Sequence, residues 1–238
     1  MRRNFLFDLD ETLLNFHASE KIGLAEVVTA NGFEFTEELY AFFKARNKEL
    51  WLKLEKGEVT REELFETRFR ELFQKCGADT GGMELLRINS EFISAMSRNG
   101  VILEGAPEFL ARLKSGVEGA KVYIVSNGAT VNALGRIRST GLDRYLDGVF
   151  ISEDMGVTKP SREFFDIVLG SIGASADECI VVGDSLTSDM LGAKNAGIAS
   201  CWFRPAGDVE KAMREYEIDY AAGDFDELYN VLVTWAEA

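Results

Sequence analysis

Short apolar runs that alternate with helical stretches constrain the fold of this chain more than any other feature. The runs are rich in β-branched and aromatic residues, and they cover residues 4–9, 122–126, 149–152, 179–183 and 200–203. Helical stretches near residues 129–139, 161–172 and 187–196 separate the later runs. Strands that are apolar on both faces and joined by crossover helices indicate a parallel sheet covered on each side. The chain is therefore predicted to have an α/β, Rossmann-like doubly wound core.

A long helical stretch interrupts this pattern between the first and second runs. From about Ser19 to Arg98 the sequence is rich in Glu, Lys and Phe, and apolar residues recur at helical spacing between Leu39 and Leu54. Thr60 and Glu63 form a capping box at the start of a further helix. We therefore expect a catalytic core of residues 1–16 and 101–238, with an inserted all-helical cap domain of residues 17–100 that has three or four helices.

The charge balance limits the partners of the chain. It has 26 basic and 40 acidic residues, a formal net charge of −14, and no basic run. Nucleic-acid polymers bind through clustered Lys and Arg, so no such partner is expected. A small phosphorylated metabolite remains compatible with this charge, because a few local donors and a metal ion decide that contact.

The sequence predicts neither a signal peptide nor a membrane-spanning segment. The apolar run that follows Arg3 is broken by Asp8, which makes it too short for a signal peptide, and no stretch approaches a membrane span. The three cysteines fit no zinc or disulfide pattern. We expect a cytoplasmic protein with no membrane partner, as a monomer or homodimer.

Polar residues that could take part in catalysis or binding follow the predicted strands. They follow the strands in chain order and comprise Asp8 and Asp10, then Ser126, Asn127 and Gly128, then Lys159, and finally Asp184 and Asp189. In open α/β sheets the carboxyl ends of the strands form the ligand-binding edge. Phosphoryl transfer needs a nucleophile, a metal ion and donors for phosphate oxygens, and this set of side chains can supply them.

Each of these residues also has an ordinary structural explanation. Asp is common in turns after strands, Ser126 could cap a helix, and Lys159 could be an exposed loop lysine. However, Asp8 and Asp10 lie two residues apart beside a buried strand, where two carboxylates require a cation or a shared proton. The joint occurrence of four such signals, each at a predicted strand end, favours a functional site.

The same segments resemble the four ordered motifs of the haloacid dehalogenase-like hydrolases. The resemblance covers essentially the whole chain and rests on Asp8-Leu-Asp-Glu-Thr-Leu13, Ser126-Asn-Gly128, Lys159-Pro160 and Gly183-Asp-Ser-Leu-Thr-Ser-Asp189. Within this superfamily the chain is most similar to the pyrimidine and nucleoside 5′-monophosphatases, or 5′-nucleotidases. The segments that point to this branch are Asn47-Lys-Glu-Leu-Trp51, Gly57-Glu-Val-Thr60, Thr140-Gly-Leu142 and Ile151-Ser-Glu-Asp-Met-Gly-Val157.

The resemblance implies a Mg²⁺-dependent phosphomonoesterase with a role for each motif residue. Asp8 is the expected nucleophile, which forms an aspartyl-phosphate, and Asp10 the expected general acid and base. The implied Mg²⁺ ligands are Asp8, the backbone carbonyl of Asp10, Asp184 and Asp189. Ser126 and Asn127 are expected to bind the phosphate, while Lys159 balances its charge. Thr12 is expected to order the loop by hydrogen bonding.

Substrate selection is expected in the cap. Asn47 and Trp51 share one face of a predicted helix, where an indole could stack on a nucleobase and an amide could pair with its edge. Packing between cap helices is the structural alternative for Trp51. We therefore expect nucleoside 5′-monophosphates as substrates, pyrimidine ones foremost.

Other functions on this fold stay open. A sugar-phosphate or phosphoglycolate phosphatase, or a phosphomutase, would use the same motifs. A dehalogenase needs no metal and would leave the acidic residues unneutralised, and a catalytically silent binding module would be expected to lack a motif residue. His17, the single histidine, has no setting typical of a histidine nucleophile and is interpreted as structural.

Overall fold

The computed structural model describes residues 2–55 and 57–238. Contacts within the chain divide it into two compact units. The first, here called the core unit, comprises Met1–Phe16 and Gly100–Ala238, and the second, the helical unit, comprises His17–Asn99. The second boundary therefore falls one residue before the position expected from the sequence.

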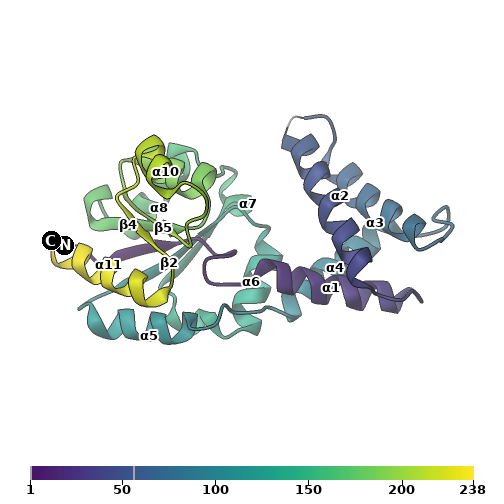
Figure 1. Cartoon of the computed structure of the whole chain (residues 1–238), viewed down its shortest axis with the longest axis horizontal. Coiled ribbons are helices and arrows are strands. Elements are labelled where there is room, and N and C mark those ends of the chain that lie inside the picture. The colour runs from purple at the N-terminus through teal and green to yellow at the C-terminus, as the bar shows by residue number, and fades with distance from the viewer. Residues whose placement is uncertain (1, 56) are drawn as a thin grey trace. The chain divides into compact units, whose positions relative to one another are not determined.

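A six-stranded parallel sheet forms the centre of the core unit (Figure 1). Its strands are β1 (Asn4–Phe7), β2 (Lys121–Ser126), β3 (Gly148–Ile151), β4 (Cys179–Gly183), β5 (Ala199–Phe203) and β6 (Tyr220–Ala222), in the order β3-β2-β1-β4-β5-β6. The first strand lies between β2 and β4, with Phe5 opposite Val122 and Ile180. The predicted α/β doubly wound fold is confirmed.

Alternation along β1 shows why helices cover both faces of the sheet. Phe5 and Phe7 point to the face covered by α5 (Ala106–Gly116), α6 (Thr130–Ser139) and α11 (Phe225–Glu237), where they pack edge-to-face on Trp235 and Phe109. Leu6 belongs to the opposite cluster, which α8 (Arg162–Ile172), α9 (Leu191–Ala196) and α10 (Val209–Tyr216) cover. All three side chains are completely buried. Hydrophobic burial on both faces therefore holds the strand ends in place.

Short helical segments complete the core unit. They are η1 (Leu142–Tyr145), α7 (Ser152–Met155), η2 (Ala176–Glu178) and the π-helical turn η3 (Leu186–Met190). The turn η3 leads directly into α9, so the helix predicted near residues 187–196 is interrupted at its start.

The helical unit consists of α1 (Phe16–Ala30), whose first residue belongs to the core unit, α2 (Glu37–Glu55), α3 (Arg61–Lys75) and α4 (Leu85–Arg98). Its centre holds the rings of Phe43, Phe69 and Phe92, with centroids 5.5–5.7 Å apart. The predicted capping box opens α3, since Thr60 accepts a hydrogen bond from Glu63 N and its own N–H donates to the Glu63 carboxylate. Across both units, each described helix is too short or too polar to cross a lipid bilayer.

Candidate active site

A buried lysine gathers the residues at the carboxyl ends of the central strands. The ammonium of Lys159 donates to Asp8 Oδ1 at 2.7 Å and to Asp189 Oδ1 at 2.6 Å. Its third hydrogen bond goes to the backbone carbonyl of Val125 at 2.7 Å. The three donors of the ammonium are thereby used, and Lys159, Asp8 and Asp189 are all buried. An exposed loop lysine is therefore the wrong structural explanation for Lys159.

Backbone contacts hold the two carboxylates beside this lysine. Asp8 follows β1 directly, and its N–H donates to Val182 O at 2.8 Å, which continues the ladder between β1 and β4. Asp189 lies on η3, and its Oδ2 accepts a hydrogen bond from Ser185 N at 3.1 Å. A Cβ atom at Gly183 would lie 2.2 Å from that same oxygen. Only glycine allows this close approach, so Gly183 shapes the site, a role that the sequence reasoning missed.

The cluster carries more negative than positive charge. Burial raises the pKa of Asp8 to about 8, against the effect of Lys159, while the charges of Asp189 and Asp10 reinforce the rise. Burial and the neighbouring Asp189 raise the pKa of Asp184 to about 6. Burial alone would lower the pKa of Lys159, but Asp189 and Asp8 together raise it, so the ammonium stays charged.

Three carboxylates of this cluster are arranged to share a cation. Carboxylate oxygens of Asp8, Asp184 and Asp189 all lie within 4.8 Å of one another. Lys159 can neutralise only one of the two buried carboxylates that it contacts. Oxygen ligands with uncompensated negative charge suit a hard divalent cation such as Mg²⁺, so the residues present fit the metal that was expected.

Cation binding at this cluster predicts a pH-dependent stabilisation. A carboxyl group whose pKa is higher in the folded than in the unfolded chain makes stability fall as pH rises between the two values. For Asp8 this range extends from 3.8 to about 8. At pH 6 a cation must displace the proton of the Asp8 carboxyl group, whereas above pH 8 this group is largely deprotonated before the cation binds. We expect Mg²⁺ to raise Tm more at pH 8.5 than at pH 6, measured by thermal unfolding. An equal or larger shift at pH 6 would contradict this site.

The residues after β2 reach the same edge of the sheet. Ser126 is buried at the end of the strand, and its Oγ accepts a hydrogen bond from Gly128 N at 3.1 Å, so its own O–H stays available to donate. The side chain of Asn127 forms two reciprocal bonds with the backbone of Lys159, through Nδ2 to the carbonyl at 2.9 Å and through Oδ1 from the N–H at 2.8 Å. Asn127 therefore holds the lysine in position, a contact that the sequence did not reveal.

Asp10 pairs with an arginine, whereas the lysine donates to other acceptors. Both of its carboxylate oxygens accept hydrogen bonds from the guanidinium of Arg136 on α6. Sequence reasoning missed Arg136, although its spacing places it on the apolar face of that helix next to Ile137. The expected hydrogen bond of Thr12 is not found: its hydroxyl is buried without a partner among the described residues.

Asn47 and Trp51, which are expected to select the substrate, have different environments within the helical unit. Asn47 is buried, and its amide donates to Glu20 Oε1 at 3.3 Å and accepts from Arg68 Nη1 at 3.2 Å. Trp51, one turn further along α2, is 37% exposed and so can still contact a ligand. His17 Nδ1 lies 3.8 Å from Glu20 Oε2, and its structural role stays a prediction.

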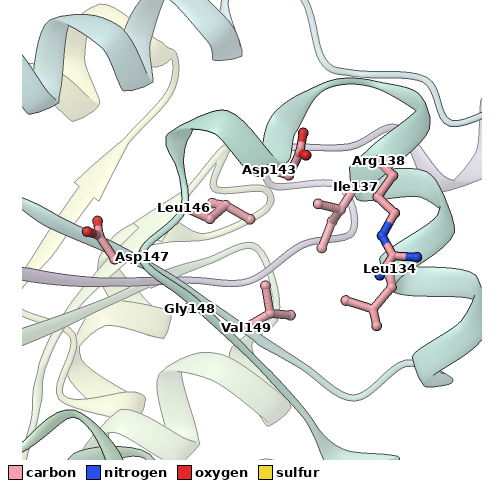
Figure 2. A pocket seen from close by; sticks show the side chains of 8 residues that line it. All are labelled: Leu134, Ile137, Arg138, Asp143, Leu146, Asp147, Gly148 and Val149. Atoms are coloured by element: carbon pink, nitrogen blue, oxygen red, sulfur yellow. The ribbon is translucent and has the colours of Figure 1, made fainter.

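A separate cleft of about 210 Å³ opens near the start of β3 (Figure 2). It is lined by Leu134, Ile137, Arg138, Asp143, Leu146, Asp147, Gly148 and Val149. None of the predicted site residues lines it, and Gly148 begins the strand, whereas the catalytic candidates follow strand ends. The candidate active site is therefore the buried cluster around Lys159.

Comparisons with known proteins relate the chain to a family of hydrolases. A family model described as haloacid dehalogenase-like hydrolase matches residues 3–197. The pyrimidine 5′-nucleotidase PynA of Streptococcus pneumoniae is 34% identical over 201 residues, which cover 84% of this chain and 83% of PynA. A ribulose-1,5-bisphosphate 5-phosphatase of Halopiger xanaduensis is 27% identical over 237 residues, or 95% of this chain and 98% of that protein.

A solved structure is similar over almost the whole length. It is that of the HAD-hydrolase YfnB of Bacillus subtilis, described as bound to magnesium, with a TM-score of 0.83. The two chains are 30% identical in this superposition, which covers 97% of this chain and 98% of YfnB.

Proposed function

Because the chain belongs to the haloacid dehalogenase-like hydrolases and is a phosphatase, we propose that it hydrolyses nucleoside 5′-monophosphates through a covalent phosphoryl intermediate on Asp8. The observation that carries the mechanism is the buried ammonium of Lys159 between Asp8 and Asp189. A nucleophilic carboxylate and a fixed positive charge together suit the attack of one anion on another.

The proposed reaction has two steps. Asp8 Oδ attacks phosphorus as the bond to the ester oxygen breaks, and Asp10 donates a proton to that leaving oxygen. Asp10 then takes a proton from a water molecule, which attacks the phosphorus and releases phosphate and free Asp8. Lys159 balances negative charge during both steps, while the hydroxyl of Ser126 and the backbone N–H groups around Asn127 bind the phosphoryl oxygens.

Two of the carboxylates proposed as metal ligands, Asp8 and Asp189, are already oriented by hydrogen bonds from Lys159. Asp8, Asp184 and Asp189 would hold Mg²⁺, together with the backbone carbonyl of Asp10. When bound, the ion neutralises phosphate oxygens and supplies the positive charge that the cluster lacks. Lys159 holds one oxygen of Asp8 in place, which restricts the direction of nucleophilic attack.

The substrate class is supported by the similarity to PynA and by the exposed indole of Trp51. A nucleobase can stack on an indole, whereas a small sugar phosphate offers no aromatic face. The similarity to a ribulose bisphosphatase supports the alternative of a sugar-phosphate substrate. A panel of phosphate esters decides between them: pyrimidine nucleoside 5′-monophosphates should have the highest kcat/KM, and a tenfold advantage for sugar phosphates would overturn the nucleotide assignment.

Substitution of the exposed indole provides a sharper test of substrate recognition. Stacking of a base on an aromatic ring is worth about 1–3 kcal/mol, so Trp51→Ala should raise KM for cytidine 5′-monophosphate by roughly tenfold. KM for p-nitrophenyl phosphate should change less. Leu52→Ala is the matched control, because Leu52 is the adjacent exposed apolar residue on α2. Equal effects of Trp51→Ala on both substrates would argue against stacking.

A further inference from the structure

A buried arginine donates two hydrogen bonds to the carboxylate that the proposed reaction uses for proton transfer. Arg136 Nη1 donates to Asp10 Oδ1, and Nη2 donates to Oδ2 at 3.1 Å, so the pair is bidentate. The Arg136 side chain is 1% exposed, whereas that of Asp10 is 30% exposed. We propose that Arg136 is the positioning residue for Asp10, a role that rests on the proposed function.

The structure gives Arg136 a rigid setting. It lies on the buried side of α6 with Ala133 and Ile137, and its guanidinium is 5.3 Å from the centre of the Phe16 ring. Its backbone carbonyl accepts a hydrogen bond from Thr140 Oγ1 at 2.7 Å. A planar guanidinium held this way presents two parallel N–H groups in one fixed direction.

Asp10 needs this partner because its side chain is only partly buried. The next residue, Glu11, turns the chain through the left-handed region with φ of 58°. Among the described residues, Arg136 is the one that donates hydrogen bonds to the Asp10 carboxylate. Each carboxylate oxygen keeps a second lone pair for a proton or a water molecule. The two hydrogen bonds from Arg136 therefore orient Asp10 and still allow it to transfer a proton.

Orientation of Asp10 should matter in proportion to the basicity of the leaving group. A nucleoside or alkyl alkoxide must be protonated as it departs, and a positioned acid contributes roughly 10²–10⁴-fold to such a step. The p-nitrophenolate anion departs without a proton. The value of kcat/KM includes steps only up to the departure of the leaving group. It therefore reports on protonation of the leaving group and excludes the later hydrolysis of the intermediate.

The test compares these two ester classes in a small set of variants, at saturating Mg²⁺ and with the fold checked by circular dichroism and Tm. Arg136→Met removes the charge and both donors, while Arg136→Lys retains the charge but not the bidentate geometry. Arg138→Met is the matched control, since Arg138 is an exposed arginine on the same helix. Asp10→Asn and the double variant with Arg136→Met complete a mutant cycle.

We expect Arg136→Met to lower kcat/KM for cytidine 5′-monophosphate by roughly 10²-fold, and Arg136→Lys to recover only part of this loss. For p-nitrophenyl phosphate, kcat/KM of Arg136→Met should fall by less than about threefold. Arg138→Met should match the wild type, and Arg136→Met should add little to Asp10→Asn. Equal losses on both esters, or full additivity with Asp10→Asn, would overturn the positioning role. A wild-type protein inactive on both esters would instead overturn the proposed function.

Discussion

Replacement of Asp8 by asparagine is expected to lower phosphate release by at least about three orders of magnitude, because it removes the attacking charge while it preserves the shape of the side chain. The measurement is steady-state hydrolysis of p-nitrophenyl phosphate with Mg²⁺. This ester needs no proton at its leaving group, so the assay isolates the nucleophile from the acid. Near-normal turnover of Asp8→Asn would contradict the mechanism.

The same substitution should leave the metal-free protein at least as stable as the wild type. Asp8 is buried with a pKa raised to about 8, and it shares Lys159 with a second buried carboxylate. The asparagine variant keeps the neutralised pair of Lys159 and Asp189 and removes a carboxyl group whose ionisation is disfavoured by burial. Asp143→Asn, at an exposed carboxylate on η1, is the matched control for both readouts. A large loss of stability in Asp8→Asn would show that its inactivity reflects unfolding.

Removal of divalent cations should have a comparably large effect. Chelation by EDTA is expected to abolish hydrolysis and Mg²⁺ to restore it, because Asp8, Asp184 and Asp189 otherwise present their charge to an anionic substrate. Ca²⁺ should restore little activity, since its larger and more variable coordination shell orients the reacting groups less well. Titration of activity against free Mg²⁺ measures this requirement.

A variant distinguishes the proposed site from an unspecific metal effect. Asp184→Asn should raise the Mg²⁺ concentration for half-maximal activity or abolish activity altogether, while Asp143→Asn should leave that concentration unchanged. Hydrolysis that continues undiminished in EDTA would contradict the proposed metal site.

The strands at the centre of the sheet were predictable because burial on both faces makes them continuous apolar runs. The edge strand β6 was not, since it has only three residues and pairs only with β5. The convergence of Asp8, Lys159 and Asp189 could also be anticipated, because parallel strands bring their carboxyl ends to one edge.

The partners of the site residues could not be read from the sequence in the same way. Arg136 and Asp10 are 126 positions apart, and no local spacing rule links them. A helical arginine next to Ile137 on the apolar face was the available signal, because a buried guanidinium requires an acceptor. The bond between Asn127 and the backbone of Lys159 likewise depends on how two loops meet. That the backbone N–H of Asn127 binds a phosphate oxygen stays a prediction.

Direct detection of the covalent intermediate tests the central claim. Asp10→Asn should still accept a phosphoryl group from p-nitrophenyl phosphate, whose leaving group needs no acid, but should hydrolyse the intermediate slowly because it lacks the base. Mass spectrometry after an acid quench should then show one added phosphoryl group, mapped to Asp8 and absent when Asp8 is also replaced by asparagine. Release of phosphate without any phosphorylated protein, or with the phosphoryl group on another carboxylate, would contradict Asp8 as the nucleophile.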